Sequence, residues 1–307
     1  LKQICPESMR WLRRTRVWLC LIGALVWTFF FQFFLMPQMT EDGLPRGRLS
    51  AVSLTWGQYG LWLLWDLVAS LGPRNVVSLA KGIFPQFANT TFYFSPTSSP
   101  GVQGLVALTI DDGICRGDQA KSMLPEVLTL LRTFSAKATF FLSSHYVHGN
   151  DVQRLLFEGH EPANHMPEDR EYSSFSAKSF ETALAETDDL LRPFLKASAP
   201  RWFRAPQGRL TKEMAQVLQA RNMSHALGDC YADDWAIPDP MRVASVYLRQ
   251  VQEGSVVIMH MPQKGFRQHT YESLRLFLRG LQKRKLQAVT LGELLAHAAK
   301  TENGKTR

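Results

Sequence analysis

The chain has 307 residues, 45% of them hydrophobic and 20% charged, which supplies a substantial core and excludes a disordered or fibrous protein. Its formal net charge is +8, but the first sixteen residues alone hold five basic side chains against one acidic, so the excess does not indicate nucleic-acid binding. Four cysteines are too few for a disulfide framework.

A long uncharged stretch follows this basic leader at residues 1–16. Val17–Met36 is about the length that a helix needs to cross ~30 Å of hydrocarbon. A cleaved signal peptide is the alternative, but its apolar core would run only ~7–15 residues and end in small side chains. We therefore predict a transmembrane signal anchor at 17–37. Because positive charge marks the cytoplasmic end of a span, the remainder is predicted to be lumenal or extracellular.

A second uncharged stretch lies within the predicted linker, residues 38–103. Leu49–Trp65 is interrupted by Gly57 and Gly60 and is rich in Trp and Tyr. This composition favours a helix at the membrane interface, or one docked on the globular domain, over a second span. A second span would return the residues after it to the cytosol.

From Gly104 onward, short β-rich runs alternate with helical patterns. The predicted strands are Leu105–Ile110, Ala138–Leu142, Trp202–Arg204, His225–Gly228, Val256–His260 and Gln287–Leu291. The predicted helices are Asp118–Phe134, Asp151–Glu158, Ala177–Leu195, Thr211–Ala220, Met241–Gln252 and Tyr271–Lys283. Such alternation predicts an α/β domain with parallel strands, either a barrel or an open sheet, over residues 104–297. A polar tail follows at 298–307.

In parallel folds of both kinds, functional residues gather at the carboxyl ends of the strands. The first predicted strand ends in Asp111 and Asp112. Neighbouring side chains on a strand point in opposite directions, so one carboxylate can bind a metal while the other faces a substrate. A solvated turn is the alternative interpretation of this pair.

A second group of titratable residues follows the helix at Asp151–Glu158. His165 and Asp169, together with Asp112, would offer one nitrogen and two oxygen ligands and leave positions open for water and substrate. That is the make-up of a catalytic divalent-metal site. Glu168 and His160 are alternatives for the third ligand, although His160 is interpreted first as a structural hydrogen-bonding residue.

Three more apolar runs end in polar or aromatic residues. These residues are Arg204, the pair Asp234 and Trp235, and His260. Each alone is compatible with ordinary packing. Five strand ends with complementary chemistry indicate an active site.

The motifs resemble those of the polysaccharide deacetylase family, which includes chitin and peptidoglycan deacetylases. The resemblance spans residues 104–295, and the wording around His165 looks most like a eukaryotic branch. The five matching motifs, in order, are Thr109–Gly113, Asn164-His165, Arg204-x-Pro206-x-Gly208, Asp234-Trp235 and Ile258-x-His260.

This resemblance implies a distorted (β/α) barrel with about seven strands. It also implies a metal-dependent hydrolase that removes acetyl groups from N-acetylated sugars of a polysaccharide, either chitin-like or a related glycan. The implied roles are Asp111 as general base, His260 as general acid and Arg204 as the group that orients Asp111. The implied metal ligands are Asp112, His165 and Asp169, and the implied substrate-binding residues are Trp235, Ile258, Gln207 and Asp234.

Three positions depart from the family pattern. Asp169 stands where the third ligand is usually histidine, which keeps zinc possible but moves the preference toward manganese, with cobalt as a further option. Gln207 replaces a common aromatic residue, and Ile114 replaces a common proline. The alternative function is therefore a catalytically inactive, membrane-anchored carbohydrate-binding protein on the same fold.

Cys115 and Cys230 are the two cysteines on the predicted lumenal side. Each lies close to one of the motifs, so a disulfide between the two loops is conceivable. Two unrelated small residues are the alternative, and the interpretation we favour.

Overall fold

The computed structural model describes residues 54–195 and 199–300. The predicted basic leader and signal anchor lie outside this part of the chain and stay predictions, as does the tail from Thr301. Within the described part, no helix is both long and apolar enough to cross a bilayer.

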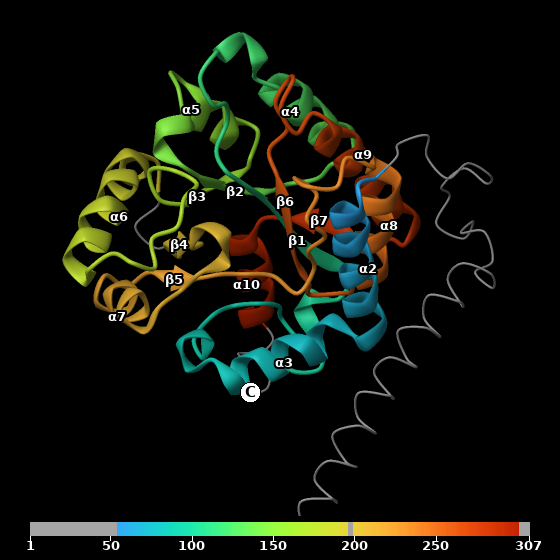
Figure 1. The fold of residues 1–307 in the computed structure, drawn as a ribbon, viewed down its shortest axis with the longest axis horizontal. Helices are drawn as coiled ribbons and strands as arrows, with labels where there is room; N and C mark the ends of the chain where they lie inside the picture. The colour runs from blue at the N-terminus through green and yellow to red at the C-terminus, as the bar shows by residue number, and fades with distance from the viewer. Residues whose placement is uncertain (1–53, 196–198, 301–307) are drawn as a thin grey trace, which may run out of the picture. The chain divides into compact units, whose positions relative to one another are not determined.

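Parallel strands form one curled sheet in the centre of the described chain (Figure 1). Their order is β5-β4-β3-β2-β1-β6, and β7 also pairs with β1, which makes seven strands in this part of the chain. Every pairing is parallel. The strands are β1 (Leu105–Asp111), β2 (Thr139–Leu142), β3 (Glu161–Asn164), β4 (Trp202–Phe203), β5 (Ser224–His225), β6 (Val256–His260) and β7 (Gln287–Val289). The structure confirms the predicted α/β class and the distorted, incomplete barrel.

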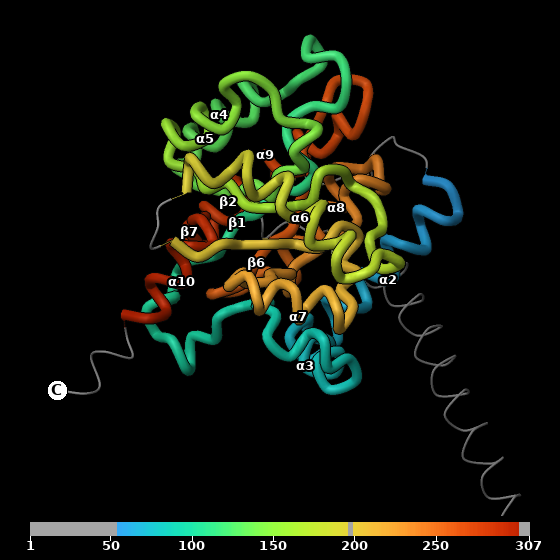
Figure 2. The backbone as a smooth tube through the Cα atoms, turned by 90° about the vertical axis from the view of Figure 1, so that its left-hand side faces the viewer, coloured from blue at the N-terminus to red at the C-terminus, as the bar shows by residue number. Residues whose placement is uncertain are grey.

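Helices cover the outer face of this sheet (Figures 1 and 2). One apolar layer joins β1, β2 and β6 to four helices, and a second joins β4 to two more. The four are α4 (Leu124–Thr133), α5 (Asp151–Phe157), α8 (Pro240–Gln250) and α9 (His269–Lys283), and the two are α6 (Ala177–Leu191) and α7 (Lys212–Ala220). Short 3-10 turns connect these elements: η1 (Pro85–Phe87), η2 (Pro100–Val102), η3 (Gln119–Lys121), η4 (Ser144–Tyr146), η5 (Arg192–Phe194) and η6 (Pro206–Gly208).

The inside of the curled sheet is a separate apolar cluster. Alternate strand residues point inward, and small ones such as Ala107 and Ala163 leave room for Phe141 and Trp202. Helix α10 (Leu291–Lys300) adds Leu291 and two further apolar residues to this cluster. Apolar packing thus fills the barrel, and the polar residues gather at the carboxyl ends of its strands.

Two helices that precede the sheet dock against it. They are α2 (Trp56–Leu71) and α3 (Pro73–Ile83), and they belong to the same compact unit as the strands. Helix α2 lies beside α8 (Figure 1), where Asp66 pairs with Arg249. The Trp65 indole donates to Asp233 at 2.7 Å. The part of the Leu49–Trp65 stretch that the structure describes, from Leu54 onward, packs on the globular domain.

Some element boundaries differ from the predictions. Strand β3 was not predicted, because its sequence Glu-Pro-Ala-Asn lacks β-branched residues and carries a proline, yet it pairs with both β2 and β4. The predicted strand at His225–Gly228 is shorter and begins at Ser224, and the predicted helix at Asp118–Phe134 begins only at Leu124. Helix α10 was also missed, and it carries the fold beyond the predicted domain end at residue 297 to Lys300.

Candidate active site

A pocket of about 850 Å³ opens at the carboxyl ends of the strands. It contains the predicted acid, base and arginine together with the three predicted metal ligands. These residues are Asp111, Asp112, His165, Asp169, Arg204 and His260. They end or follow four different strands, which is why residues distant in sequence meet there.

Asp111 is held by a buried arginine at the mouth of the barrel. Arg204 Nη1 donates to Asp111 Oδ1 at 2.5 Å and to Thr109 Oγ1 at 2.7 Å, and its Nε donates to the Ala226 carbonyl at 3.0 Å. The guanidinium lies 4.0 Å from the centre of the Phe141 ring. Burial lowers the pKa of Arg204, while the Asp111 carboxylate acts in the opposite direction. The network fixes Asp111 in one orientation toward the pocket.

His260 stands opposite Asp111 in the β1–β6 register. Its Nδ1 lies 2.6 Å from Asp234 Oδ1, and its backbone amide donates to Asp234 Oδ2 at 2.9 Å. Burial alone would lower the pKa of His260, but the charge and hydrogen bond of Asp234 raise it to about 9. A protonated imidazole at neutral pH suits a general acid.

The position of Asp234 corrects one prediction. It was expected to bind substrate, but it is fully buried behind His260, and both of its carboxylate oxygens are used by that residue. Asp234 is therefore a positioning residue for His260.

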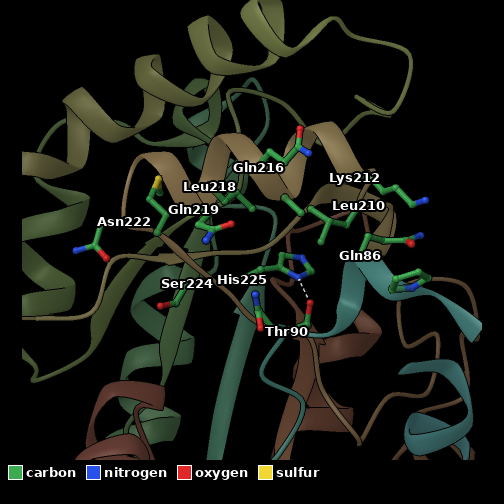
Figure 3. A pocket seen from close by; sticks show the side chains of 14 residues that line it. Gln86, Thr90, Leu210, Lys212, Gln216, Leu218, Gln219, Asn222, Ser224 and His225 are labelled. Atoms are coloured by element: carbon green, nitrogen blue, oxygen red, sulfur yellow. Dashed lines mark hydrogen bonds between the residues drawn. The ribbon is translucent and has the colours of Figure 1, made fainter. Parts of the chain in front are cut away.

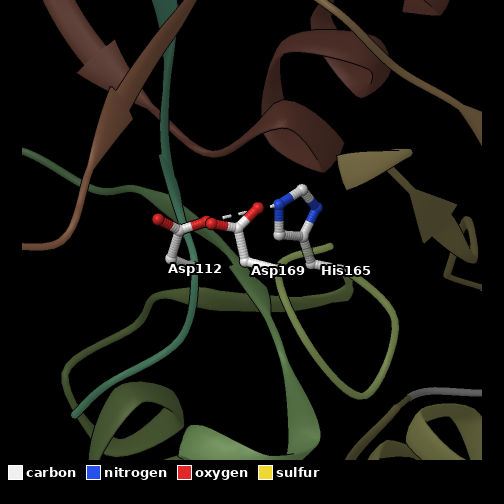
Figure 4. A group of neighbouring side chains, drawn as sticks. All are labelled: Asp112, His165 and Asp169. Carbon is white, nitrogen blue, oxygen red and sulfur yellow. Dashed lines mark ion pairs between the residues drawn. The ribbon is translucent and has the colours of Figure 1, made fainter. Parts of the chain in front are cut away.

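Asp112, His165 and Asp169 converge as predicted, with ligand atoms within 4.8 Å of one another (Figure 4). The Arg204 carbonyl lies 2.9 Å from His165 Nδ1, so Nδ1 carries a proton and donates a hydrogen bond to that carbonyl. The other ring nitrogen, Nε2, lies 3.5 Å from Asp112 Oδ1 and is the one that can bind a metal ion. The alternative ligand Glu168 lies away from this triad and contacts His145 at 3.1 Å instead.

The electrostatics of the triad are set by its neighbours. Burial would raise the pKa of Asp112, but the His165 hydrogen bond and the charges of His260 and Arg267 hold it well below its usual range. Burial would lower the pKa of His165, yet the surrounding carboxylates, Asp112 first, raise it. The site therefore stabilises charged groups despite being largely closed to solvent.

Two arginines at the triad were not predicted. Arg267 donates to Asp112 Oδ2, and Arg116 Nη2 lies 2.7 Å from Asp169 Oδ2 and 3.4 Å from Asp112 Oδ2. Both follow strand ends, in the loops after β1 and β6. Polar residues are common in loops, and only the folding of these two loops back across the pocket brings the arginines to the triad, so the sequence carries no signal for them.

The donor atoms of the triad fit a divalent metal ion. One imidazole nitrogen with two carboxylates is a ligand set that binds zinc, and the second carboxylate also suits harder ions such as manganese. The imidazole is held in the tautomer that leaves its Nε2 available. Arg116 and Arg267 already balance part of the negative charge of these carboxylates.

Three predicted substrate-binding residues line the same pocket. Trp235 is 45% exposed, and its indole is fixed by Tyr231 and Asp233 at 3.0 and 3.1 Å. Ile258 forms an apolar wall, which Gly228 approaches so closely that an added Cβ would lie 2.8 Å from Ile258 Cγ1. Gln207 is exposed on η6 with a φ of 56°, a strained value for a non-glycine residue.

Residues 99–226 match the family model described as polysaccharide deacetylase. The chain contains a polysaccharide deacetylase domain. A peptidoglycan-N-acetylglucosamine deacetylase from Bacillus cereus is 28% identical over 202 residues, which cover 64% of this chain and 91% of that relative.

Two solved structures share the fold of this deacetylase domain. A CE4 family pseudoenzyme from Bacillus anthracis matches with a TM-score of 0.56 and 23% identity, covering 66% of this chain and 68% of that one. A family 4 acetyl xylan esterase from Clostridium thermocellum, in complex with a cobalt ion, matches with a TM-score of 0.54 and 26% identity. It covers 62% of this chain and 90% of that one.

Other candidate residues have structural roles in the deacetylase domain. His160 Nδ1 accepts from the Ala138 amide at 3.2 Å, and burial lowers its pKa to about 4, which agrees with the structural interpretation. Cys115 and Cys230 are both buried and free, and their sulfurs contact different carbonyls, those of Asp118 and Tyr247.

A second pocket, of about 410 Å³, lies between η1 and α7 (Figure 3). It contains His225, whose Nε2 accepts from the Ala205 amide at 3.4 Å while Nδ1–H points to Thr90 Oγ1 at 2.8 Å. Burial and the charge of Arg204 lower the pKa of His225 to about 3. No carboxylate lines this pocket among the described residues, so His225 has no acidic partner there of the kind that Asp234 provides for His260.

Proposed function

We propose that the protein is a metal-dependent hydrolase that removes acetyl groups from N-acetylated sugars of a chitin-like or related glycan. The observation that carries the proposal is the placement of Asp111 and His260 opposite each other on β1 and β6, beside the Asp–His–Asp triad. The likeness to a peptidoglycan-N-acetylglucosamine deacetylase supports this substrate class.

The reaction adds water across the acetamide and breaks its C–N bond, which yields acetate and a free amine. Asp111, oriented by Arg204, accepts a proton from the attacking water. His260, protonated at neutral pH and held by Asp234, donates a proton to the leaving nitrogen. Trp235 and Ile258 wall the pocket around the acetyl group.

Asp112, His165 and Asp169 would hold the metal ion, which we propose to be zinc, with manganese or cobalt as alternatives. When bound, such an ion supplies Lewis-acid polarisation of the acetamide carbonyl. The cobalt ion in the related acetyl xylan esterase supports a metal requirement.

We also propose that the catalytic domain is lumenal or extracellular and is held to the membrane by the signal anchor at 17–37. The sequon at Asn89 offers a test, because Asn89 is exposed on the described surface. Expression with sealed microsomes should yield a form with a glycan on Asn89 that Asn89→Gln removes. A full chain that inserts but carries no glycan there would contradict this orientation.

A second candidate function is a catalytically inactive carbohydrate-binding protein. It is favoured by the pairing of Arg116 and Arg267 with the carboxylates that would coordinate the metal. This candidate requires sugar binding without bound metal, so metal analysis of the purified chain separates the two.

The direct test is acetate release from N-acetylglucosamine oligomers by the full chain, supplied in turn with zinc, manganese and cobalt. We expect one acetate for each new amine, and loss of the activity after treatment with a chelator. Oligomer binding without acetate release under any of these ions would favour the inactive candidate.

A further inference from the structure

The catalytic pocket continues well beyond the acid, the base and the triad. One end of it, here called the apolar arm, is lined by residues of α2 and α3. They are Trp65, Val68, Pro73, Val76, Val77 and Ala80. These helices precede the residues that match the family model, so the arm is an addition to the matched domain.

The polar side chains next to the apolar arm already bond to the protein. Asp229 accepts from Arg74 at 2.9 Å, from Ser255 at 3.1 Å and from the Val256 amide at 3.0 Å. A sugar unit presents many hydroxyl groups that need hydrogen-bonding partners, and groups occupied in this way offer few.

Two more polar side chains that line the pocket are also occupied by hydrogen bonds within the protein. Asp233 accepts from Trp65 at 2.7 Å and from the Tyr231 hydroxyl at 2.6 Å. Gln250 accepts from the Tyr231 amide at 2.8 Å. The arm therefore suits an apolar ligand group rather than a continuing sugar chain.

The arm is a built part of the structure. Arg74 anchors the start of α3 by donating to Asp229 and, at 2.7 Å, to the Glu253 carbonyl, and it lies 4.3 Å from the Tyr93 ring centre. The Asp66–Arg249 pair anchors α2 in the same way. These contacts hold the two helices as a fixed wall of the pocket.

The outer surface of the two helices is also apolar. On α2, Leu64 lies four residues before the arm residue Val68 and Leu71 lies three residues after it, and these leucines are 50% and 58% exposed. On α3, Leu79 and Ile83 lie three and seven residues after the arm residue Val76, and they are 64% and 58% exposed. The apolar lining of the arm is thus continuous with an exposed apolar stripe on each helix.

We infer that the arm receives the apolar aglycone of an amphiphilic N-acetylated sugar, so that the substrate class is a glycolipid. The inference rests on the proposed deacetylase function, because it assumes that the sugar occupies the catalytic end of the same pocket. Continuity of the arm with Asp111 and His260 means that one molecule can fill both ends. The exposed stripes give its lipid portion an apolar path to the pocket.

The test compares two substrates that share the N-acetylglucosamine group, its octyl β-glycoside below its micellar concentration and its methyl β-glycoside. The full chain is kept in phosphatidylcholine nanodiscs so that no detergent competes. We expect kcat/KM to be at least about tenfold higher for the octyl glycoside, because the arm removes its chain from water. Calorimetric titration should show the same order of affinity.

Ala80→Leu narrows the arm while keeping it apolar and helical. We expect this variant to bring the octyl-to-methyl ratio of kcat/KM close to one. Ser78→Leu is the matched control, since it introduces the same side chain on the same helix at an exposed position outside the pocket, and it should keep the wild-type ratio.

The outcomes separate this inference from the proposed function. Equal kcat/KM for the two glycosides, or an unchanged ratio in Ala80→Leu, overturns the glycolipid inference and leaves the deacetylase proposal intact. If neither glycoside releases acetate, the deacetylase proposal fails. Calorimetry then tests the glycolipid inference by itself. Tighter binding of the octyl glycoside supports the inference, and equal or absent binding of the two glycosides refutes it.

Discussion

Two histidines, the half-buried His260 and the buried His225, lie in two pockets of the same domain and differ in almost every chemical respect. His260 is backed by Asp234, which raises its pKa to about 9. His225 is bonded to Thr90 and a backbone amide, and its pKa is lowered to about 3. Desolvation lowers the pKa of both, so the neighbouring carboxylate decides whether such an imidazole is a proton donor or a neutral structural group.

The same contrast extends to the pockets as wholes. The catalytic pocket gathers aspartates and arginines that compensate one another, whereas the pocket beside α7 has Lys212 as its charged lining residue among those described. The following variants test whether this compensation makes one pocket reactive and the other inert.

Arg204→Met should have the largest effect, because it leaves the buried Asp111 carboxylate without its partner. We expect the free energy of unfolding to fall by about 3–5 kcal/mol, measured by urea denaturation, with activity lost as well. Arg209→Met is the control, since Arg209 forms a solvent-exposed pair with Glu171 and should cost less than about 1 kcal/mol. Equal losses in the two variants would contradict the compensation described for the catalytic pocket.

Asp169→Ala should weaken metal retention by at least about 10–100-fold, as judged by metal analysis after dialysis. The carboxylate is one of three converging ligands, so its removal leaves two. Asp169→His should retain the ion and move the preference from manganese toward zinc. Full metal content in Asp169→Ala would place the third ligand elsewhere.

Asp234→Asn should make His260 resemble His225. An acid must be protonated to act, so wild-type kcat/KM should fall as pH rises through about 9, the pKa of His260. Without the Asp234 charge that pKa drops, the fall moves to lower pH, and the rate at pH 8 decreases by about 10–100-fold. Asp189→Asn, at an exposed position, serves as control. An unshifted alkaline limb would remove His260 from the role of acid.

His225→Gln should have the smallest effect, and it is on stability. The pKa of His225 is about 3 when folded and about 6.5 when unfolded, so the unfolded chain binds more protons between these values and stability decreases as the pH is lowered through this range. The wild type should lose about 1–2 kcal/mol more than the variant between pH 7 and pH 5 in urea denaturation. Identical pH slopes would mean that His225 is not neutral in the fold.

Much of the fold follows from the sequence because it depends on local periodicity. The strand Val256–His260 matches its prediction fully, since four apolar residues, three of them β-branched, end at the polar His260. Strand β3 was not predicted because Glu161 and Pro162 have low strand propensity. Its strand conformation comes from its pairing with the flanking strands β2 and β4.

The residues of the site also differ in how far the sequence predicts them. Asp111, Asp112 and His260 were predictable because each stands at the end of an apolar run. Arg116 and Arg267 were not, because their roles depend on how loops fold back across the pocket. The position of Asp234 behind His260 also depends on tertiary structure, since sequence alone does not show which way a loop carboxylate points.

The central claim is the division of labour between the adjacent aspartates at the end of β1. Its most direct test measures metal content and acetate release together in Asp111→Asn and Asp112→Asn. We expect Asp111→Asn to retain the ion but lose turnover, and Asp112→Asn to lose both. Loss of the ion in Asp111→Asn, or turnover without the carboxylate of Asp112, would contradict it.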